Sequence, residues 1–143
     1  MNFISVNASD VNSKPSYYFF NILLKLWHLG FGLTCFLSFT DAPIISVTDA
    51  TFEKTKATRT VTCVPIGNPG INTFYKWQHR SKHGVLIRDL DGGGNGVLTI
   101  PNIPVDDRYQ DSGEYVCTAG NGIVGKDDNV KQTGSGYVTV YGM

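Results

Sequence analysis

The chain has 143 residues, and its twelve basic and twelve acidic side chains cancel to a net charge of zero. This balance gives no electrostatic argument for a nucleic-acid partner or an acidic partner. Three cysteines are too few for a disulfide-dense mini-protein and suit one bridge plus one remaining thiol.

The N-terminal part of the chain is polar at first and then apolar. Residues 1–16 are polar, and residues 17–39 form an apolar run that contains Lys25. A bilayer-spanning helix needs about 20 such residues, so the length fits and the lysine weakens the match. We predict that residues 1–42 are a polar leader followed by a cleaved signal peptide or an uncleaved signal anchor. A buried extension of the folded part is the third interpretation.

Both membrane interpretations place the rest of the chain outside the cell. Lys14 precedes the apolar run and Asp41 follows it, which favours a cytoplasmic N-terminus. Pro43 follows the small residues of the candidate cleavage site, where signal peptidase tolerates proline badly. Cys35 lies inside the run and is interpreted as an apolar side chain, not as a bridge partner. Membrane contact is expected only through residues 17–39.

Alternating apolar residues predict the first strands. Residues 43–47 are expected to form a short edge strand, where a proline without an N–H does least harm. Residues 58–64 predict a second strand that turns Val61 and Cys63 inward. The next predicted strand carries Tyr75 and Trp77 on its inner face.

The middle of the chain predicts two more short strands around a glycine-rich turn. Residues 84–88 form the first of these, and residues 97–100 form the second, with Leu98 and Ile100 inward. The glycine-rich residues 91–96 lack the Lys-Ser/Thr of a phosphate-binding loop and do not open a helix, so we interpret them as a plain turn.

A turn and a strand surround the last cysteine. Asp111-Ser112-Gly113 is turn chemistry, because Asp and Ser bond nearby backbone and Gly accepts positive φ. Tyr115 and Cys117 then share one face of an extended strand. Asp111 and the preceding Asp106 and Asp107 lack the spacing of a calcium loop, and we interpret these three as solvated turn carboxylates.

The C-terminal part predicts a hairpin with a long connection. Residues 120–122 combine glycine and asparagine, which tolerate the left-handed conformation of a tight turn. A polar stretch, 126–135, lengthens the connection before a last predicted strand at 136–141. The apolar pair Ile123 and Val124 stands beside the charged Lys126, which is the composition of a small interface centre.

Several of these residues occur in the order typical of one fold family. Between residues 43 and 141 the chain resembles an immunoglobulin-like domain, on the motif residues Cys63, Trp77, Leu98 and Asp111-x-Gly113-x-Tyr115-x-Cys117. Two segments, 63–69 and 117–125, are similar to motifs of the intermediate set of this family. Pro65 departs from that pattern, because the family has a small residue there.

The resemblance implies an all-β fold, an antiparallel Greek-key sandwich of two sheets. It implies a disulfide between Cys63 and Cys117, and a Tyr115 hydroxyl that bonds backbone at the preceding corner. The interval between Trp77 and Leu98 leaves no room for the additional C′–C″ hairpin of variable-type domains, so residues 84–88 would be a single strand, C′ or D. The implied structural core residues are Trp77, Tyr115, Leu98, Ile100, Asp111 and Gly113.

The sequence offers little for catalysis. His79 and His83 are four apart near the end of a strand, without the helix that such a metal pair needs, and are interpreted as exposed loop histidines. Ser112 would need one of them from the far end of a different strand, so we reject a serine triad. We expect no enzyme activity, no metal and no cofactor.

The resemblance implies a module for extracellular protein–protein recognition or cell adhesion, with a homophilic or heterophilic protein partner. The expected contact surface is the hairpin that carries Ile123, Val124 and Lys126, because binding residues often lie on loops held by a rigid scaffold. One alternative is a structural spacer, like the modules of intracellular muscle filament arrays. Another is a fragment of a larger multidomain receptor.

Overall fold

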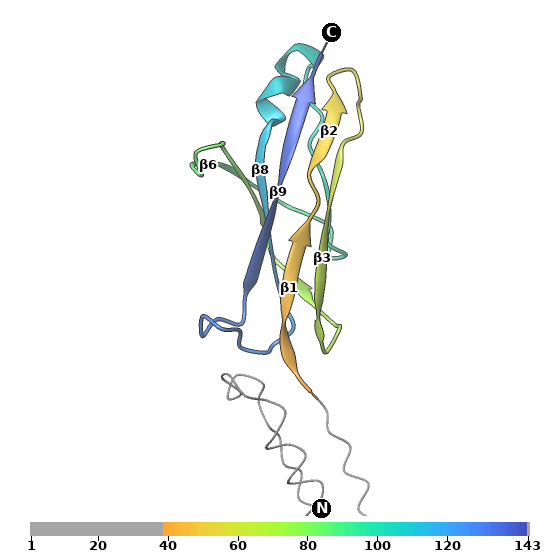
Figure 1. Cartoon of the computed structure of the whole chain (residues 1–143). Helices are drawn as coiled ribbons and strands as arrows, with labels where there is room; N and C mark the ends of the chain where they lie inside the picture. Colours follow the sequence, from red (N-terminus) through yellow and green to blue (C-terminus); the bar gives the residue numbers. More distant parts are fainter. Residues whose placement is uncertain (1–38, 143) are drawn as a thin grey trace, which may run out of the picture.

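The computed structural model describes residues 39–142, which form two β-sheets in face-to-face contact (Figure 1). The predictions for Cys35 and for all of the leader and apolar run before Phe39 lie outside these residues. None of the helices in residues 39–142 has the length and apolar character needed to cross a bilayer.

The elements follow one another along the chain as β1 (Asp41–Val47), β2 (Ala50–Glu53), β3 (Thr60–Asn68), β4 (Thr73–Phe74), β5 (Trp77–Arg80), β6 (Leu86–Leu90), β7 (Val97–Thr99), the 3₁₀ helix η2 (Val105–Asp111), β8 (Gly113–Gly120) and β9 (Gln132–Tyr141). One sheet has the order β1-β3-β7, and the other has the order β2-β9-β8-β5-β6, with β4 paired to β8. The pairings are antiparallel except for β2 with β9, which are parallel. The predicted all-β sandwich is confirmed.

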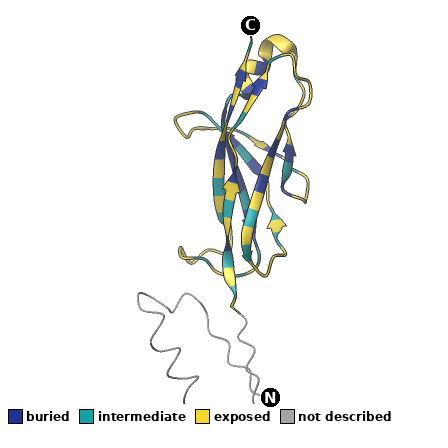
Figure 2. Cartoon of the chain, turned by 45° about the vertical axis from the view of Figure 1, so that its right-hand side comes forward, coloured by how far each residue is buried: buried dark blue, intermediate teal, exposed yellow. Residues whose placement is uncertain are grey.

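Side chains alternate between core and solvent along the strands, as the pleat requires (Figure 2). In β3, Val61 and Cys63 are buried while Thr60, Thr62 and Val64 are exposed. The two inner faces meet in one apolar core, built from Val47, Phe52, Val61, Cys63, Trp77, Leu90, Leu98, Ile100, Tyr115, Cys117, Val138 and Val140.

The strand expected to end at Trp77 is interrupted, and the prediction for Tyr75 is wrong. β4 pairs Phe74 with Ala119, whereas β5 pairs Gln78 with Val116, so the register shifts by one residue between them. A one-residue bulge reverses the inward and outward faces beyond it. Phe74 and Trp77 therefore both contact the core, and Tyr75 is 37% exposed.

The other strand predictions differ in their bounds. β3 extends to Asn68, and β1 begins at Asp41, two residues before the expected start of the domain. After Val47 the chain changes sheets, and β2 pairs with β9 as a strand that sequence reasoning missed. β6 pairs with β5, so it is strand C′ and not strand D.

The last strand begins four residues earlier than expected. β9 starts at Gln132, so the hairpin connection is residues 121–131. A glycine explains the missed start: a Cβ on Gly134 would lie 2.9 Å from Ile45 Cγ2, because β1 passes close over this part of β9. Glycine counts against a strand in sequence reasoning, yet here it permits close approach of two backbones.

Candidate functional site

The disulfide joins the two sheets at the centre of the core. Cys63 on β3 and Cys117 on β8 are bonded, with a Cα–Cα distance of 6.2 Å. Trp77 belongs to the same core cluster and is 1% exposed. Leu98 and Ile100 are also buried. This bridge is the one that the resemblance implied.

A cluster of buried polar side chains lies at the corner where η2 enters β8. We call Arg59, His79, Arg88, Asp111 and Tyr115 the corner cluster. The Asp111 carboxylate accepts from the Arg59 guanidinium at 2.7 Å and from the Arg88 guanidinium at 2.5 Å. The side chains of Asp111 and Arg59 are completely buried. The interpretation of Asp111 as a solvated turn carboxylate is therefore wrong, whereas Asp106 and Asp107 are exposed.

Tyr115 anchors strand β8 to this corner. Its buried hydroxyl donates to the Asp111 carbonyl oxygen at 2.9 Å. Burial, and next the nearby Asp111 carboxylate, raise the pKa of the Tyr115 phenol to about 12, so it remains a hydrogen-bond donor. Gly113 has φ 154°, and a Cβ there would lie 2.6 Å from His79 Nε2. Glycine at this position therefore gives the His79 ring its space.

The prediction of an exposed His79 is wrong. Its side chain is fully buried, because it lies on the inner face of β5 two residues after Trp77. The ring stacks on Tyr115 with centroids 4.5 Å apart and an interplanar angle of 14°. Its Nε2 lies 3.3 Å from the Ser112 carbonyl oxygen, while the Ser112 hydroxyl accepts from the Val140 N–H. His79 and Ser112 are thus neighbours, but the ring does not contact the hydroxyl that a triad would need.

At the opposite end of the sandwich, the Asn121 side chain joins neighbouring segments. The Asn121 side chain donates to the carbonyl oxygens of Asp41, at 2.7 Å, and Pro69, at 3.1 Å. Its own oxygen accepts from the Ile123 N–H at 3.1 Å. We call Asn121, the hairpin connection 121–131, the loop 69–72 and the start of β1 the loop end. One asparagine thereby joins three chain segments there.

The hairpin connection has its own internal order. The Gly125 N–H donates to the Asn129 carbonyl oxygen at 2.9 Å, and the Asp128 N–H donates to the Gly125 carbonyl oxygen at 3.2 Å. Asp128 adopts φ 53°, a left-handed conformation that aspartate tolerates in turns. The Gln132 amide then donates to the Asn129 carbonyl oxygen at 2.6 Å.

The three predicted contact residues differ in their exposure to solvent. Val124 is 47% exposed and Lys126 is exposed, but Ile123 is half-buried. Sequence reasoning missed Val130, which is 42% exposed at the far side of the same connection. It also missed Lys131, whose ammonium group lies 4.3 Å from the Tyr75 ring centroid. The outward turn of Tyr75 at the bulge makes this contact possible.

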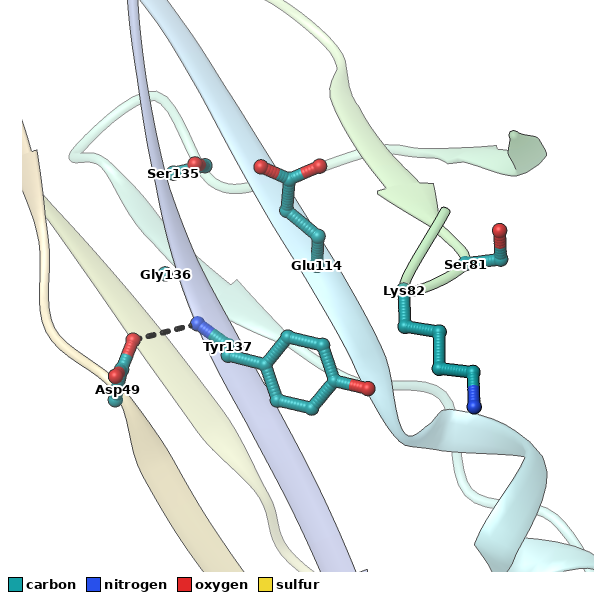
Figure 3. A pocket seen from close by; sticks show the side chains of 7 residues that line it. All are labelled: Asp49, Ser81, Lys82, Glu114, Ser135, Gly136 and Tyr137. Atoms are coloured by element: carbon teal, nitrogen blue, oxygen red, sulfur yellow. Dashed lines mark hydrogen bonds between the residues drawn. The ribbon is translucent and has the colours of Figure 1, made fainter. Parts of the chain in front are cut away.

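A shallow, open hollow of about 280 Å³ is lined by residues outside the hairpin connection (Figure 3). Its polar wall includes an Asp49 carboxylate that accepts from the Tyr137 N–H at 2.7 Å. The hollow is lined by Asp49, Ser81, Lys82, Glu114, Ser135, Gly136 and Tyr137. Within residues 39–142 there is no group of three or more His, Cys, Asp or Glu side chains that could hold a metal ion.

No family model and no curated protein matches this chain. Among solved structures, it is similar to Sidekick-1 immunoglobulin domains 1–4, with 19% identity over 74% of this chain and a TM-score of 0.49. It is also similar to extracellular domains 3–5 of Drosophila OTK, with 22% identity over 73% of this chain and a TM-score of 0.43. For the M1 domain from titin, the identity is 15% over 70% of this chain and the TM-score is 0.43.

The matches cover 28% of the Sidekick-1 chain, 33% of the OTK chain and 93% of the titin domain. The chain thus spans less than two thirds of the first two. The fold of this chain is identified from its own structural features. The strand order of the two sheets, the inter-sheet disulfide, the buried Trp77 and the Tyr115 corner together give the chain the fold of an immunoglobulin-like domain.

Proposed function

We propose that the chain is an extracellular, non-catalytic module for protein–protein recognition, and that its contact surface is the loop end. One observation carries this proposal: the hairpin connection is held rigidly and yet exposes apolar side chains. Asn121 ties it to two other segments, and Val124 and Val130 remain exposed on it. The partner is a protein, either a second copy of the chain or a different ectodomain.

The chemistry of the loop end fits a small interface. Apolar centres with charged or polar rims are typical of protein contacts. Val124 and Val130 would supply the centre, and Lys126 and Lys131 the rim. Because the connection is already ordered by its own hydrogen bonds, binding would cost little further conformational entropy. Ile123 would support the neighbouring Val124 from its half-buried position.

The disulfide supports a location outside the cytosol. Bridges such as Cys63–Cys117 persist mainly in oxidising compartments. This agrees with the interpretation of residues 1–42 as a leader with a signal peptide or a signal anchor, and of the following domain as an exported one. Membership in the intermediate set remains part of this proposal, on the motifs around Cys63 and Cys117.

A paired substitution at the loop end tests the contact surface. We expect Ile123→Ser with Val124→Ser to weaken binding by about 1–2 kcal/mol, because apolar contact area is lost from an interface centre. Multivalent beads that carry the chain measure homophilic aggregation, and the same multimer on a panel of cell-surface ectodomains measures heterophilic binding.

A matched control is placed at strand β6, outside the loop end. Val85→Ser with Ile87→Ser removes two apolar side chains of similar or greater exposure, 65% and 52%, from the β6 region. This control should bind like the unchanged chain. If instead the control loses affinity and the loop-end variant keeps it, the contact surface lies on the β6 edge and the proposal is wrong.

A structural spacer is the second candidate, and the path of the chain favours it. The described chain enters at the end that carries the 121–131 connection and leaves at the opposite end (Figure 1). Domains with ends placed this way can be joined in a linear array. Intact-mass analysis after expression in secretory cells separates the candidates, since an exported module should carry the oxidised bridge and a cytosolic spacer should carry reduced thiols.

A further inference from the structure

His79 is a titratable side chain in the interior, and the proposed recognition role does not use it. Its ring lies between the Tyr115 ring and the backbone of Ser112 and Gly113. The tight fit above Gly113 leaves the ring little room to turn toward another partner. The protonation state of this ring therefore depends on the groups around it.

The hydrogen-bond pattern identifies the neutral tautomer. A carbonyl oxygen can only accept, so the contact with Ser112 places the single proton on Nε2. The other nitrogen, Nδ1, is buried and has no hydrogen-bond partner in the part of the chain that the structure describes. A second proton would have to bind Nδ1, where it would become a buried donor without an acceptor.

The charges around the ring also oppose an imidazolium. Arg88, from β6, is cationic and is the register partner of His79 on β5, so both lie on the same side of the sheet. Arg59, just before β3, is a second cation of the cluster and is paired with Asp111. Asp111, from η2, is an anion of this cluster, but each of its oxygens already accepts from a guanidinium group. Tyr115, from β8, stays neutral because its pKa is raised to about 12.

We propose that His79 makes this domain acid-sensitive: protonation of its ring destabilises the corner cluster and promotes opening of the end of the sandwich where η2 meets β8. The inference does not depend on the recognition role. Its consequence is a domain that is rigid at neutral pH and loosens at the mildly acidic pH at which histidines act as switches.

The direction of the pH effect follows from linkage. Burial lowers the pKa of the His79 imidazole below its ordinary 6.5; the Ser112 carbonyl opposes this, Arg88 lowers the pKa further, and Asp111 raises it. The unfolded chain therefore binds this proton more readily than the folded domain. Stability is fully present above pH 6.5, the ordinary pKa, and is lost as the pH falls through the lower pKa of the folded state.

Urea unfolding of the full chain, measured at several pH values, tests the proposal. Between about pH 7 and about pH 5, this one group can raise the unfolding constant by at most about 25-fold, and carboxylates titrate mostly below that window. His79→Phe keeps a ring to stack on Tyr115 but binds no proton, so its unfolding constant should lack most of this rise. His83→Gln, at an exposed position, should retain it.

Direct titration of His79 by NMR in the folded chain provides a second measurement, which holds even if His79→Phe does not fold. The expected result is a folded-state pKa below 6.5. On acidification, the protection factors of the backbone amides of residues 111–115, which correct for the slower intrinsic exchange in acid, should fall more than those of the loop end. A His79 that titrates at or above 6.5, or a His79→Phe variant that keeps the full pH dependence, overturns the proposal.

Discussion

The two ends of the sandwich are held together by different chemistry. At the corner cluster, charged groups are removed from water and paired with one another, as in the Arg59–Asp111 ion pair. At the loop end, a neutral amide on Asn121 bonds backbone carbonyl oxygens, and apolar side chains such as Val124 face the solvent. Both ends use strand β8 or the residues next to it.

Folding of the domain should depend more on the corner cluster than on the loop end. Groups of the corner cluster come from segments far apart in the sequence, so the cluster forms only when both sheets are assembled. Removing one partner there leaves an uncompensated buried charge. At the loop end, the Asn121 amide and the carbonyl oxygens that it bonds remain near water, so changes there should act locally. Binding surfaces commonly occupy such regions.

The largest effect is expected for Asp111→Ala. This change leaves the buried Arg59 guanidinium without its anion, which should lower the free energy of unfolding by about 3–5 kcal/mol. Urea denaturation measures it. Asp107→Ala, in the same 3₁₀ helix but exposed, is the control and should change stability by no more than about 0.5 kcal/mol. Equal effects in both variants would contradict the central role of the corner cluster.

A smaller and more local effect is expected for Asn121→Asp. The substitution keeps the shape but replaces a donor amide by a carboxylate that faces the Asp41 and Pro69 carbonyl oxygens. We expect a loss of about 1–2 kcal/mol, since two hydrogen bonds disappear. Hydrogen exchange should accelerate at residues 69–72 and 121–131 and stay unchanged at the corner. If hydrogen exchange accelerated equally over the whole domain, the two ends would not open independently of each other.

The smallest effect is expected for Tyr115→Phe, which removes only the hydroxyl bond to the Asp111 carbonyl oxygen. The loss should be about 1 kcal/mol at neutral pH. Because the folded-state pKa of Tyr115 is raised to about 12 from 10.0, its contribution is present below pH 10 and is lost as the pH rises toward 12. If Tyr115→Phe loses as much stability at alkaline pH as the unchanged chain, another group causes that loss.

Much of the fold could be predicted because its signals are local. Val61 and Cys63 alternate with exposed neighbours along one strand, and Tyr115 and Cys117 are two residues apart on another, so they share one face. Turn residues before Tyr115 mark the corner. The order of these motifs resembles that of immunoglobulin-like domains, and this resemblance implied the sandwich and its bridge.

The errors occurred where distant segments decide the outcome. Tyr75 lies outside because of a one-residue shift between two pairings with β8, which no local pattern of residues 73–80 indicates. The start of β9 was missed because it contains Gly134, which makes room for β1. In both places a neighbour from another part of the chain determines the backbone.

The strand alternation and the turns could be predicted from the sequence alone, because these features depend on residues near one another. The environments of His79 and Asp111 depend instead on contacts that form in the folded domain. Arg59 is 52 residues from Asp111 in the chain, and Ser112 is 33 residues from His79. Whether such polar side chains are solvated or buried depends on partners that reach them only when the two sheets close, so their chemistry is a property of the folded domain.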